Sequence, residues 1–306
     1  MRIEHSLPPA FLGRRPIRVL VVGAGGTGSA VLMGLPYLDQ AMRVWGHPDG
    51  LQVSIMDADT VSETNCVRQP FSASDIGQNK ATVLVNRINM FWGTNWSAEP
   101  SFFNERTLRR SYDEVPDLLI GCVDTRAARK VIDQAVTRPM YATTYWLDIG
   151  NNAASGQYVL GQPLNSRNRR AAVRLRTVSE LYPEIVDTAA GEDLLPSCSA
   201  IEALDRQEPF INQTLASSAL AMLARLFRYG KLNHHGAFFN AETGRMSALP
   251  IDPQMWTKVR RRNRRLQQQL KQQIDHHPHS IQSNHTHWRC PCFSNSFHSC
   301  VRGLCF

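Results

Sequence analysis

The chain has 306 residues, of which 42% are hydrophobic, and a formal net charge of +8. It is long enough to bury a large core and fits one or two domains, and it has no apolar run near the roughly 20 residues that span a bilayer. Because the N-terminus is polar and contains proline, it does not resemble a signal peptide, and we expect a cytoplasmic protein without a membrane segment.

The first predicted elements are a buried strand at 17–22, a glycine-rich turn and a helix at 27–40. The β-branched strand is typical of a parallel sheet, and the glycines let backbone N–H groups approach a phosphate at the start of the helix. These glycines are Gly23, Gly25, Gly26 and Gly28. By itself the turn indicates only a Rossmann-like nucleotide site, which dinucleotide-dependent oxidoreductases share.

The residues after a second strand, predicted at 51–57, favour a triphosphate over a dinucleotide. Asp57 stands where an acid binds ribose hydroxyls, and Asn65, Arg68 and then Lys80 follow it. Two added cations suit ATP that is about to lose pyrophosphate, because its β- and γ-phosphates must be neutralised. The alternative for Arg68 and Lys80 is a solvated surface position.

A later strand at 117–122 runs into Asp124, which precedes a helix at 125–137. Open α/β sheets bind ligands at the carboxyl ends of their strands, so Asp124 is a candidate to hold a Mg²⁺ ion that bridges phosphates. An aspartate in this position is also a favoured N-cap. The two roles are compatible.

The other elements alternate in the first half, as in a parallel sheet, and become short strands with a final hairpin in the second half. They are predicted at 78–92, 97–102, 143–149, 158–160, 210–229, 237–240 and 245–249, with an irregular segment at 163–205. We therefore predict an α/β, Rossmann-like fold flanked by helices. Its mixed sheet is parallel in the N-terminal half and antiparallel in the C-terminal half.

At these residues the chain resembles the ThiF/MoeB family, which shares its adenylating fold with the ubiquitin-activating enzymes. The resemblance covers roughly residues 17–250 and rests on four ordered motifs. They are GxGGxG at 23–28, DxDxVxxxNxxRQ at 57–69, GQxK at 77–80 and the acid at 124. Segments 61–63, 77–81 and 85–89 further resemble the ThiF-family members of bacterial PRTRC gene clusters.

The resemblance implies that a carboxylate attacks the α-phosphate of ATP and forms an acyl-adenylate and pyrophosphate. In the roles that it implies, the glycines cradle the triphosphate and Asp57 binds the ribose. Asn65 and Arg68 contact phosphates. Lys80 steadies the leaving pyrophosphate, and Asp124 holds Mg²⁺. The implied partners are a second copy of the chain, in a homodimer, and a small ubiquitin-like or sulfur-carrier protein of β-grasp fold, which supplies the carboxylate from its C-terminal diglycine.

Cys198 lies in a Pro- and Ser-rich loop before the predicted helix at 210–229, and its position resembles the family's nucleophile-bearing loop. Such a thiol can receive the activated acyl group if a nearby cation or helix terminus favours the thiolate. The alternative is a buried small hydrophobic residue, because no base is visible in the sequence. Cys66 and Cys122 are poorer candidates, since they lie in a motif and in a strand.

Three features depart from the family pattern. Residues 1–257 contain no CxxC pair, so we expect no structural zinc in the core. The N-terminal arginine motif that completes the partner's ATP site is missing, and Arg14 and Arg15 are the candidates to replace it. Thr125 follows Asp124 where asparagine is usual, which removes one amide but not the metal ligand.

The positive charge is concentrated after residue 257. Nine Lys and Arg residues and one acid lie from 258 onward, so the preceding residues carry equal numbers of both signs. Nucleic acid binding is therefore expected only through 258–271, and a solvated helix is the alternative. The predicted divisions are an arm at 1–16, an adenylation domain at 17–257, a basic glutamine-rich helix at 258–275 and a disordered His- and Cys-rich tail at 276–306.

Two other functions remain open at this stage. One is an NAD-dependent oxidoreductase, against which Asn65, Arg68 and Lys80 argue. The other is a non-catalytic scaffold that binds nucleotide and a partner, because a fold does not determine a function.

Overall fold

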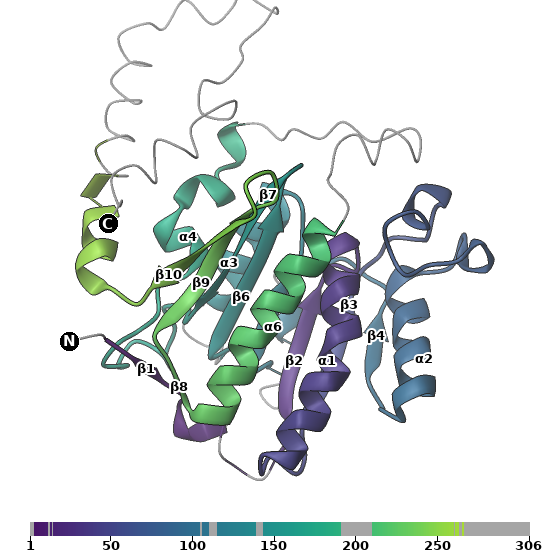
Figure 1. Cartoon of the computed structure of the whole chain (residues 1–306), viewed down its shortest axis with the longest axis horizontal. Coiled ribbons are helices and arrows are strands. Elements are labelled where there is room, and N and C mark those ends of the chain that lie inside the picture. Colours follow the sequence, from purple (N-terminus) through teal and green to yellow (C-terminus); the bar gives the residue numbers. More distant parts are fainter. Residues whose placement is uncertain are drawn as a thin grey trace, which may run out of the picture. The chain divides into compact units, whose positions relative to one another are not determined.

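An eight-stranded mixed sheet organises the computed structural model of the chain (Figure 1). Its strand order is β10-β9-β7-β6-β5-β2-β3-β4. These strands are β2 (Ile17–Val22), β3 (Leu51–Met56), β4 (Ser97–Glu99), β5 (Leu118–Gly121), β6 (Tyr145–Asn151), β7 (Ser155–Gly161), β9 (His234–Asn240) and β10 (Arg245–Pro250). Neighbours from β4 to β6 are parallel, and those from β6 to β10 are antiparallel. This confirms the predicted mixed sheet.

The structure describes residues 3–11, 13, 15–104, 106–109, 115–138, 143–190, 210–259, 261, 262 and 265. All but the last three belong to one unit, Met1–Arg260, and a second unit comprises Arg261–Phe306. A helix at 253–259 begins before the predicted basic helix, most of which lies outside the described residues, as does the tail at 276–306. No helix in the described ranges is long and apolar enough to cross a membrane.

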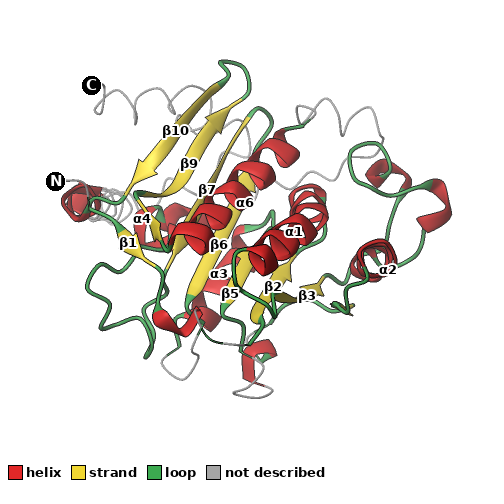
Figure 2. Cartoon of the chain, turned by 60° about the horizontal axis from the view of Figure 1, so that its bottom comes forward, coloured by secondary structure: helices red, strands yellow, loops and turns green. Residues whose placement is uncertain are grey.

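Two long helices lie side by side on one face of the sheet (Figure 2). They are α1 (Gly26–Val44) and α6 (Ile211–Tyr229). Their close approach depends on Gly34 of α1, because a Cβ there would collide with Leu220 of α6. The other helices are α2 (Lys80–Trp92), α3 (Arg126–Val136) and α4 (Val178–Leu181). Short 3-10 helices lie at Pro9–Phe11, Glu63–Asn65, Ala73–Asp75, Thr107–Arg109, Pro183–Val186 and Thr188–Ala190.

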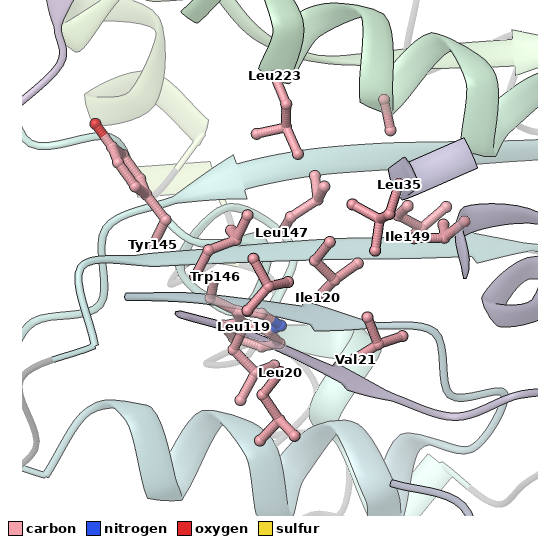
Figure 3. Close-up of a cluster of buried hydrophobic side chains, with 14 of the residues drawn as sticks. Leu20, Val21, Leu35, Leu119, Ile120, Tyr145, Trp146, Leu147, Ile149 and Leu223 are labelled. Atoms are coloured by element: carbon pink, nitrogen blue, oxygen red, sulfur yellow. The ribbon is translucent and has the colours of Figure 1, made fainter. Parts of the chain in front are cut away.

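Buried side chains cover both faces of the central strands β2 and β5, which explains why these two strands are apolar at almost every position, whereas β3 alternates with exposed Gln52. One row of paired residues is Val21, Ile120 and Leu147, and it lies on the side of the sheet nearer Leu223 of α6 (Figure 3). The row on the opposite side is Leu20, Leu119 and Trp146. The sheet is therefore the centre of one continuous hydrophobic core.

The structure differs from the predicted elements mainly at their ends. Helix α1 continues to Val44 instead of 40, because Leu38 and Met42 extend its buried stripe. Strand β4 ends at Glu99 instead of 102. The segment predicted to be irregular contains α4, which begins with a Thr177–Glu180 capping box. A small two-stranded sheet of β1 (His5–Ser6) and β8 (Lys231–Leu232) was not predicted.

A buried histidine in β9 should make the fold sensitive to acid. The Nδ1 atom of His235 lies 2.8 Å from the carbonyl oxygen of Leu160, and Nε2 has no hydrogen-bond partner among the described residues. The Trp256 ring packs against the His235 ring, with 5.3 Å between the ring centroids. Burial lowers the pKa of His235 to about 4. The charges of neighbouring His5 and His234 add to this shift, and only the hydrogen bond to Leu160 opposes it.

We expect the free energy of unfolding to fall as the pH drops from 6.5 to 4, because the unfolded histidine takes up a proton that the folded one resists. The loss attributable to His235 is about 3 kcal/mol. Urea unfolding at several pH values would measure it, with His235→Phe as the control that removes the titrating group. Equal pH dependence in both proteins would contradict this assignment.

Candidate nucleotide-binding site

The predicted site residues gather at the carboxyl edge of the parallel strands. Gly23 follows β2, Asp57 follows β3 and Asp124 lies three residues after β5. Strand β2 is hydrogen-bonded to β3 on one side and to β5 on the other. The chain therefore continues from β2 to β3 and β4 on one side, and then crosses to β5 on the opposite side of β2. Such a crossover point is where doubly wound sheets bind ligands.

The glycine turn between β2 and α1 is packed against backbone at its two ends. Gly23 has a φ of 96°, and a Cβ there would lie 2.7 Å from the carbonyl oxygen of Cys122. A Cβ on Gly28 would collide with the carbonyl oxygen of Gly23. At these two positions glycine is required by the fold itself.

The middle of the turn is different. Among the described residues, nothing lies within 4 Å of the position that a Cβ on Gly25 would occupy, whereas a Cβ on Gly26 would lie 2.5 Å from Nδ2 of Asn212. Gly25 is the N-cap of α1, no side chain in the described part of the chain caps this end of the helix, and the first turn of α1 contains no acid. The open space beside Gly25 thus adjoins a helix N-terminus without a capping side chain, which is suited to a phosphate.

This difference gives a paired prediction. Gly25→Ala should leave the free energy of unfolding nearly unchanged, since φ is −72° and space is open, but should weaken ATP binding about 10-fold or more by filling the phosphate side of the turn. Gly28→Ala should destabilise the fold by roughly 2 kcal/mol or more, because its Cβ meets backbone. Calorimetric ATP titration and urea unfolding of both variants would separate the effects. Equal losses of affinity and stability in the two variants would refute the distinction.

Asp57 ties the end of β3 to the glycine turn. The N–H of Ala24 donates to its Oδ2 at 2.5 Å, and the N–H of Asp59 donates to Oδ1 at 2.7 Å. Burial nevertheless raises the pKa of Asp57, with the charge of Asp59 adding to the effect. Each carboxylate oxygen still has a lone pair with which to accept a ribose hydroxyl.

Lys80 is held at the same edge by an ion pair. Its Nζ lies 3.1 Å from Oδ2 of Asp59, and only 8% of the residue is exposed, so the interpretation of Lys80 as a solvated surface charge is wrong. The side chain of Asn79 fixes the start of α2 by donating to the carbonyl oxygens of Asp57 and Asp59. No chemical role was predicted for Asp59, and the structure shows that it is the partner of Lys80.

Asn65 and Arg68 lie in the turn after β3 and are both partly buried. Oδ1 of Asn65 accepts a hydrogen bond from the N–H of Ser62 at 2.9 Å, and the N–H of Arg68 donates to the Asn65 carbonyl at 3.3 Å. The amide oxygen of Asn65 thus closes its own turn. Its Nδ2 is the group suited to donate to a phosphate.

Asp124 does not cap the helix that follows it. The N-cap of α3 is Thr125, whose hydroxyl accepts the N–H of Ala128 at 3.1 Å, so the interpretation of Asp124 as the cap is wrong. Asp124 is exposed, and Arg129 donates from Nη1 to its carbonyl oxygen at 3.4 Å. Within the described ranges, no group of three His, Cys, Asp or Glu side chains is placed to hold a metal. A magnesium ion would therefore need oxygens from phosphates and water beside Asp124.

Four further residues were candidates, two cysteines and two arginines. Cys198 and Arg14 lie outside the described residues. Burial raises the pKa of the Cys122 thiol, which makes it a poor nucleophile. Arg15 forms a bidentate pair with Asp117 of its own chain, with bonds of 2.7 and 2.8 Å, and its expected role in a partner's site stays a prediction.

Sequence reasoning missed a polar group beside the glycine turn. The hydroxyl of Thr27 lies 2.8 Å from Oδ1 of Asn212 and 3.1 Å from Oδ1 of Asn151. A buried ion pair under the Asp124 loop was also missed, between Arg129 and Asp148, with 3.2 Å separating Nε and Oδ1. These residues come from different elements, and no local motif marks them.

The open glycine turn at the crossover point of a mixed sheet defines a Rossmann-like nucleotide-binding domain. The chain belongs to the ThiF family, whose sequence profile matches residues 14–254.

Solved structures share this fold at low sequence identity. The PaaA crystal structure matches with a TM-score of 0.51 and 13% identity, covering 76% of this chain and 64% of PaaA. E. coli MccB crystallised with ATP matches with a TM-score of 0.50 and 16% identity, covering 78% of this chain and 64% of MccB. The chain thus spans less than two thirds of either protein. No curated protein sequence matches it significantly.

Proposed function

We propose that this protein is an ATP-dependent adenylating enzyme of ThiF type that activates the C-terminal carboxylate of a small ubiquitin-like protein. The observation that carries the proposal is the space beside Gly25 at the N-terminus of α1, which adjoins the edge where Asp57, Lys80 and Asp124 lie. Membership of the ThiF family supports the reaction class. ATP bound to the structurally similar MccB is consistent with a triphosphate at such a fold.

In the proposed reaction, a carboxylate oxygen forms a bond to the α-phosphorus of ATP while the bond from that phosphorus to the bridging oxygen breaks and pyrophosphate leaves. The N–H groups at the start of α1 and the cations of Arg68 and Lys80 stabilise the phosphate charge. Asp57 orients the ribose. Mg²⁺, when bound, neutralises phosphate oxygens, and Asp124 is the residue that would hold it.

In the proposed reaction, the ammonium group of Lys80 has to leave Asp59 and pair with a phosphate when ATP binds. Its ammonium is paired with Asp59, whose side chain is 55% exposed, so the pair is accessible to water and weak enough to yield to a phosphate. The aliphatic part of the Lys80 side chain is buried, and its ammonium group lies at the edge of the site. The side chain is therefore already oriented before ATP binds.

Three finer features belong to the same proposal. The sulfur of Cys198 attacks the acyl carbon of the adenylate and loses its proton, so that a carbon–sulfur bond forms, the bond to the phosphate oxygen breaks and AMP leaves. The active form is a homodimer. The protein belongs with the ThiF-family members of PRTRC clusters, which the segments at 61–63, 77–81 and 85–89 support.

ATP–pyrophosphate exchange tests the proposal directly. The full-length protein would be assayed with Mg²⁺ and a β-grasp protein encoded beside its gene, and each component would be left out in turn. Exchange that needs all of them supports the proposed adenylation, and Cys198→Ala should retain it while losing any thiol-linked product. ATP binding without exchange for any such partner would instead indicate a nucleotide-binding scaffold. Nicotinamide binding without exchange would indicate an oxidoreductase.

A further inference from the structure

Three elements meet at the hydroxyl of Thr27. Thr27 lies in the first turn of α1, Asn151 is the last residue of β6, and Asn212 is the second residue of α6. The Thr27 hydroxyl lies 2.8 Å from Oδ1 of Asn212 and 3.1 Å from Oδ1 of Asn151. Thr27 is 7% exposed and Asn212 is 5% exposed, so these bonds form away from water and are costly to leave unmade.

The donors and acceptors show which bond is stronger. Nδ2 of Asn151 donates to the carbonyl oxygen of Asn152 at 3.3 Å, which turns its Oδ1 toward Thr27. A threonine hydroxyl has a single hydrogen, so it serves one of the two amide oxygens at a time. The shorter distance favours Asn212.

Asn212 also packs against the glycine turn, beside Gly26. Its Nδ2 lies 2.5 Å from the position that a Cβ on Gly26 would occupy, whereas the corresponding position on Gly25 is open. The side chain of Asn212 therefore fills the protein side of the turn, and no described residue fills the other side. Gly26 is needed to make room for this amide.

The start of α6 is itself held in an unfavourable conformation. Phe210, directly before the helix, has a φ of 67° and is the only non-glycine residue with positive φ among those the structure describes. Its side chain is 74% exposed, so its own packing does not explain this conformation. The neighbouring contacts of Ile211, which is 1% exposed, and of Asn212 fix the helix start in place.

We propose that Asn212 is a positioning residue for the nucleotide, which acts through Thr27 and Gly26. This inference rests on the proposed ATP site. Asn212 holds the backbone of the glycine turn in the conformation that aims the N–H groups of α1 at the phosphates. Without the amide of Asn212, the glycine turn has to become ordered when ATP binds. The free energy of this ordering is subtracted from the binding free energy, so the affinity for ATP decreases.

The experiment is calorimetric titration of the full-length protein with a non-hydrolysable ATP analogue and Mg²⁺. Asn212→Ala is expected to raise the Kd about 10-fold with a small change in Tm. Asn212→Asp keeps the acceptor for Thr27, and its charge at the helix N-terminus offsets part of the cost of burying a carboxylate, so a moderate fall in Tm is expected. It should raise the Kd further than alanine does, because the carboxylate repels the phosphates. A merely structural role would lower the Tm and leave the Kd of the folded protein unchanged.

Two comparisons sharpen the test. Asn165, a buried asparagine near the amino end of β6, donates to the carbonyl oxygens of Val136 and Thr143, so Asn165→Ala should lower the Tm without changing the Kd. Gly26→Ala should weaken binding in the wild-type background but much less beside Asn212→Ala, where the clash at 2.5 Å is gone.

Wild-type Kd values in both Asn212 variants would overturn the inference and leave the proposed function intact. If alanine unfolds the protein, the aspartate variant decides by the same criterion. A wild-type protein that does not bind the analogue would overturn the proposed function, and the inference with it.

Discussion

Asp124→Ala is expected to reduce ATP–pyrophosphate exchange about 100- to 1,000-fold, the range seen when one group that stabilises transition-state charge is removed. The Asp124 side chain makes no hydrogen bond or ion pair in the described part of the chain, and the residue is exposed. The helix after it is capped by Thr125. Its removal should therefore leave the free energy of unfolding unchanged, so the lost activity reports on chemistry alone.

Thr125→Ala is the matched control for this prediction. It removes the hydroxyl that accepts the Ala128 N–H and should cost about 1 kcal/mol of stability. Because Thr125 has no expected contact with the metal, exchange should stay within a few-fold of the wild-type rate. Full exchange in Asp124→Ala would remove Asp124 from the mechanism. Loss of exchange equal in both variants would show that the loop, and not the carboxylate, matters.

The parallel half of the fold could be predicted because its signals are local. Each of the strands β2, β3 and β5 is a short run of mainly apolar residues, such as Ile17–Val22, and glycine or an acid follows it within three residues. Right-handed crossovers limit the possible arrangements of these strands, and their order, β6-β5-β2-β3-β4, comes from the structure. Helix ends were less accurate, since the end of α1 depends on burial of Leu38 and Met42 against the assembled core.

The contacts that shape the candidate site could not be predicted in the same way. Thr27 and Asn212 are separated by 185 residues, and Thr27 and Asn151 by 124. Asparagine and threonine are common in turns, so neither residue type at these positions indicates a buried bond. Even the Lys80–Asp59 pair spans 21 residues and depends on how α2 returns to β3. Motifs locate the atoms that face a ligand, while the supporting contacts depend on the tertiary fold.

The second large effect is expected at the ion pair under the Asp124 loop. Arg129 and Asp148 are 7% and 0% exposed, and Nε of Arg129 lies 3.2 Å from Oδ1 of Asp148. Arg129→Met should lower the free energy of unfolding by about 3–5 kcal/mol, because it leaves a carboxylate buried without its cation. Urea unfolding measures this loss. A change below about 1 kcal/mol would contradict the prediction.

The pH dependence of this loss identifies its cause. Burial raises the pKa of Asp148 even with Arg129 beside it, and the pKa rises further when the cation is removed. The folded variant then binds a proton that the unfolded chain releases, so its stability falls as the pH rises above the unfolded value of about 4. Arg129→Met should therefore be more destabilised at pH 8 than at pH 5.

The variant with both Arg129→Met and Asp148→Leu separates folding from positioning. Replacing both charges by apolar groups should restore most of the stability, since neither a carboxylate nor a guanidinium remains buried. It does not restore the bond of 3.4 Å from Nη1 of Arg129 to the carbonyl oxygen of Asp124. We expect this double variant to unfold at nearly the wild-type urea concentration and still to exchange pyrophosphate more slowly than the wild type. Recovery of both properties would show that Arg129 serves the fold alone.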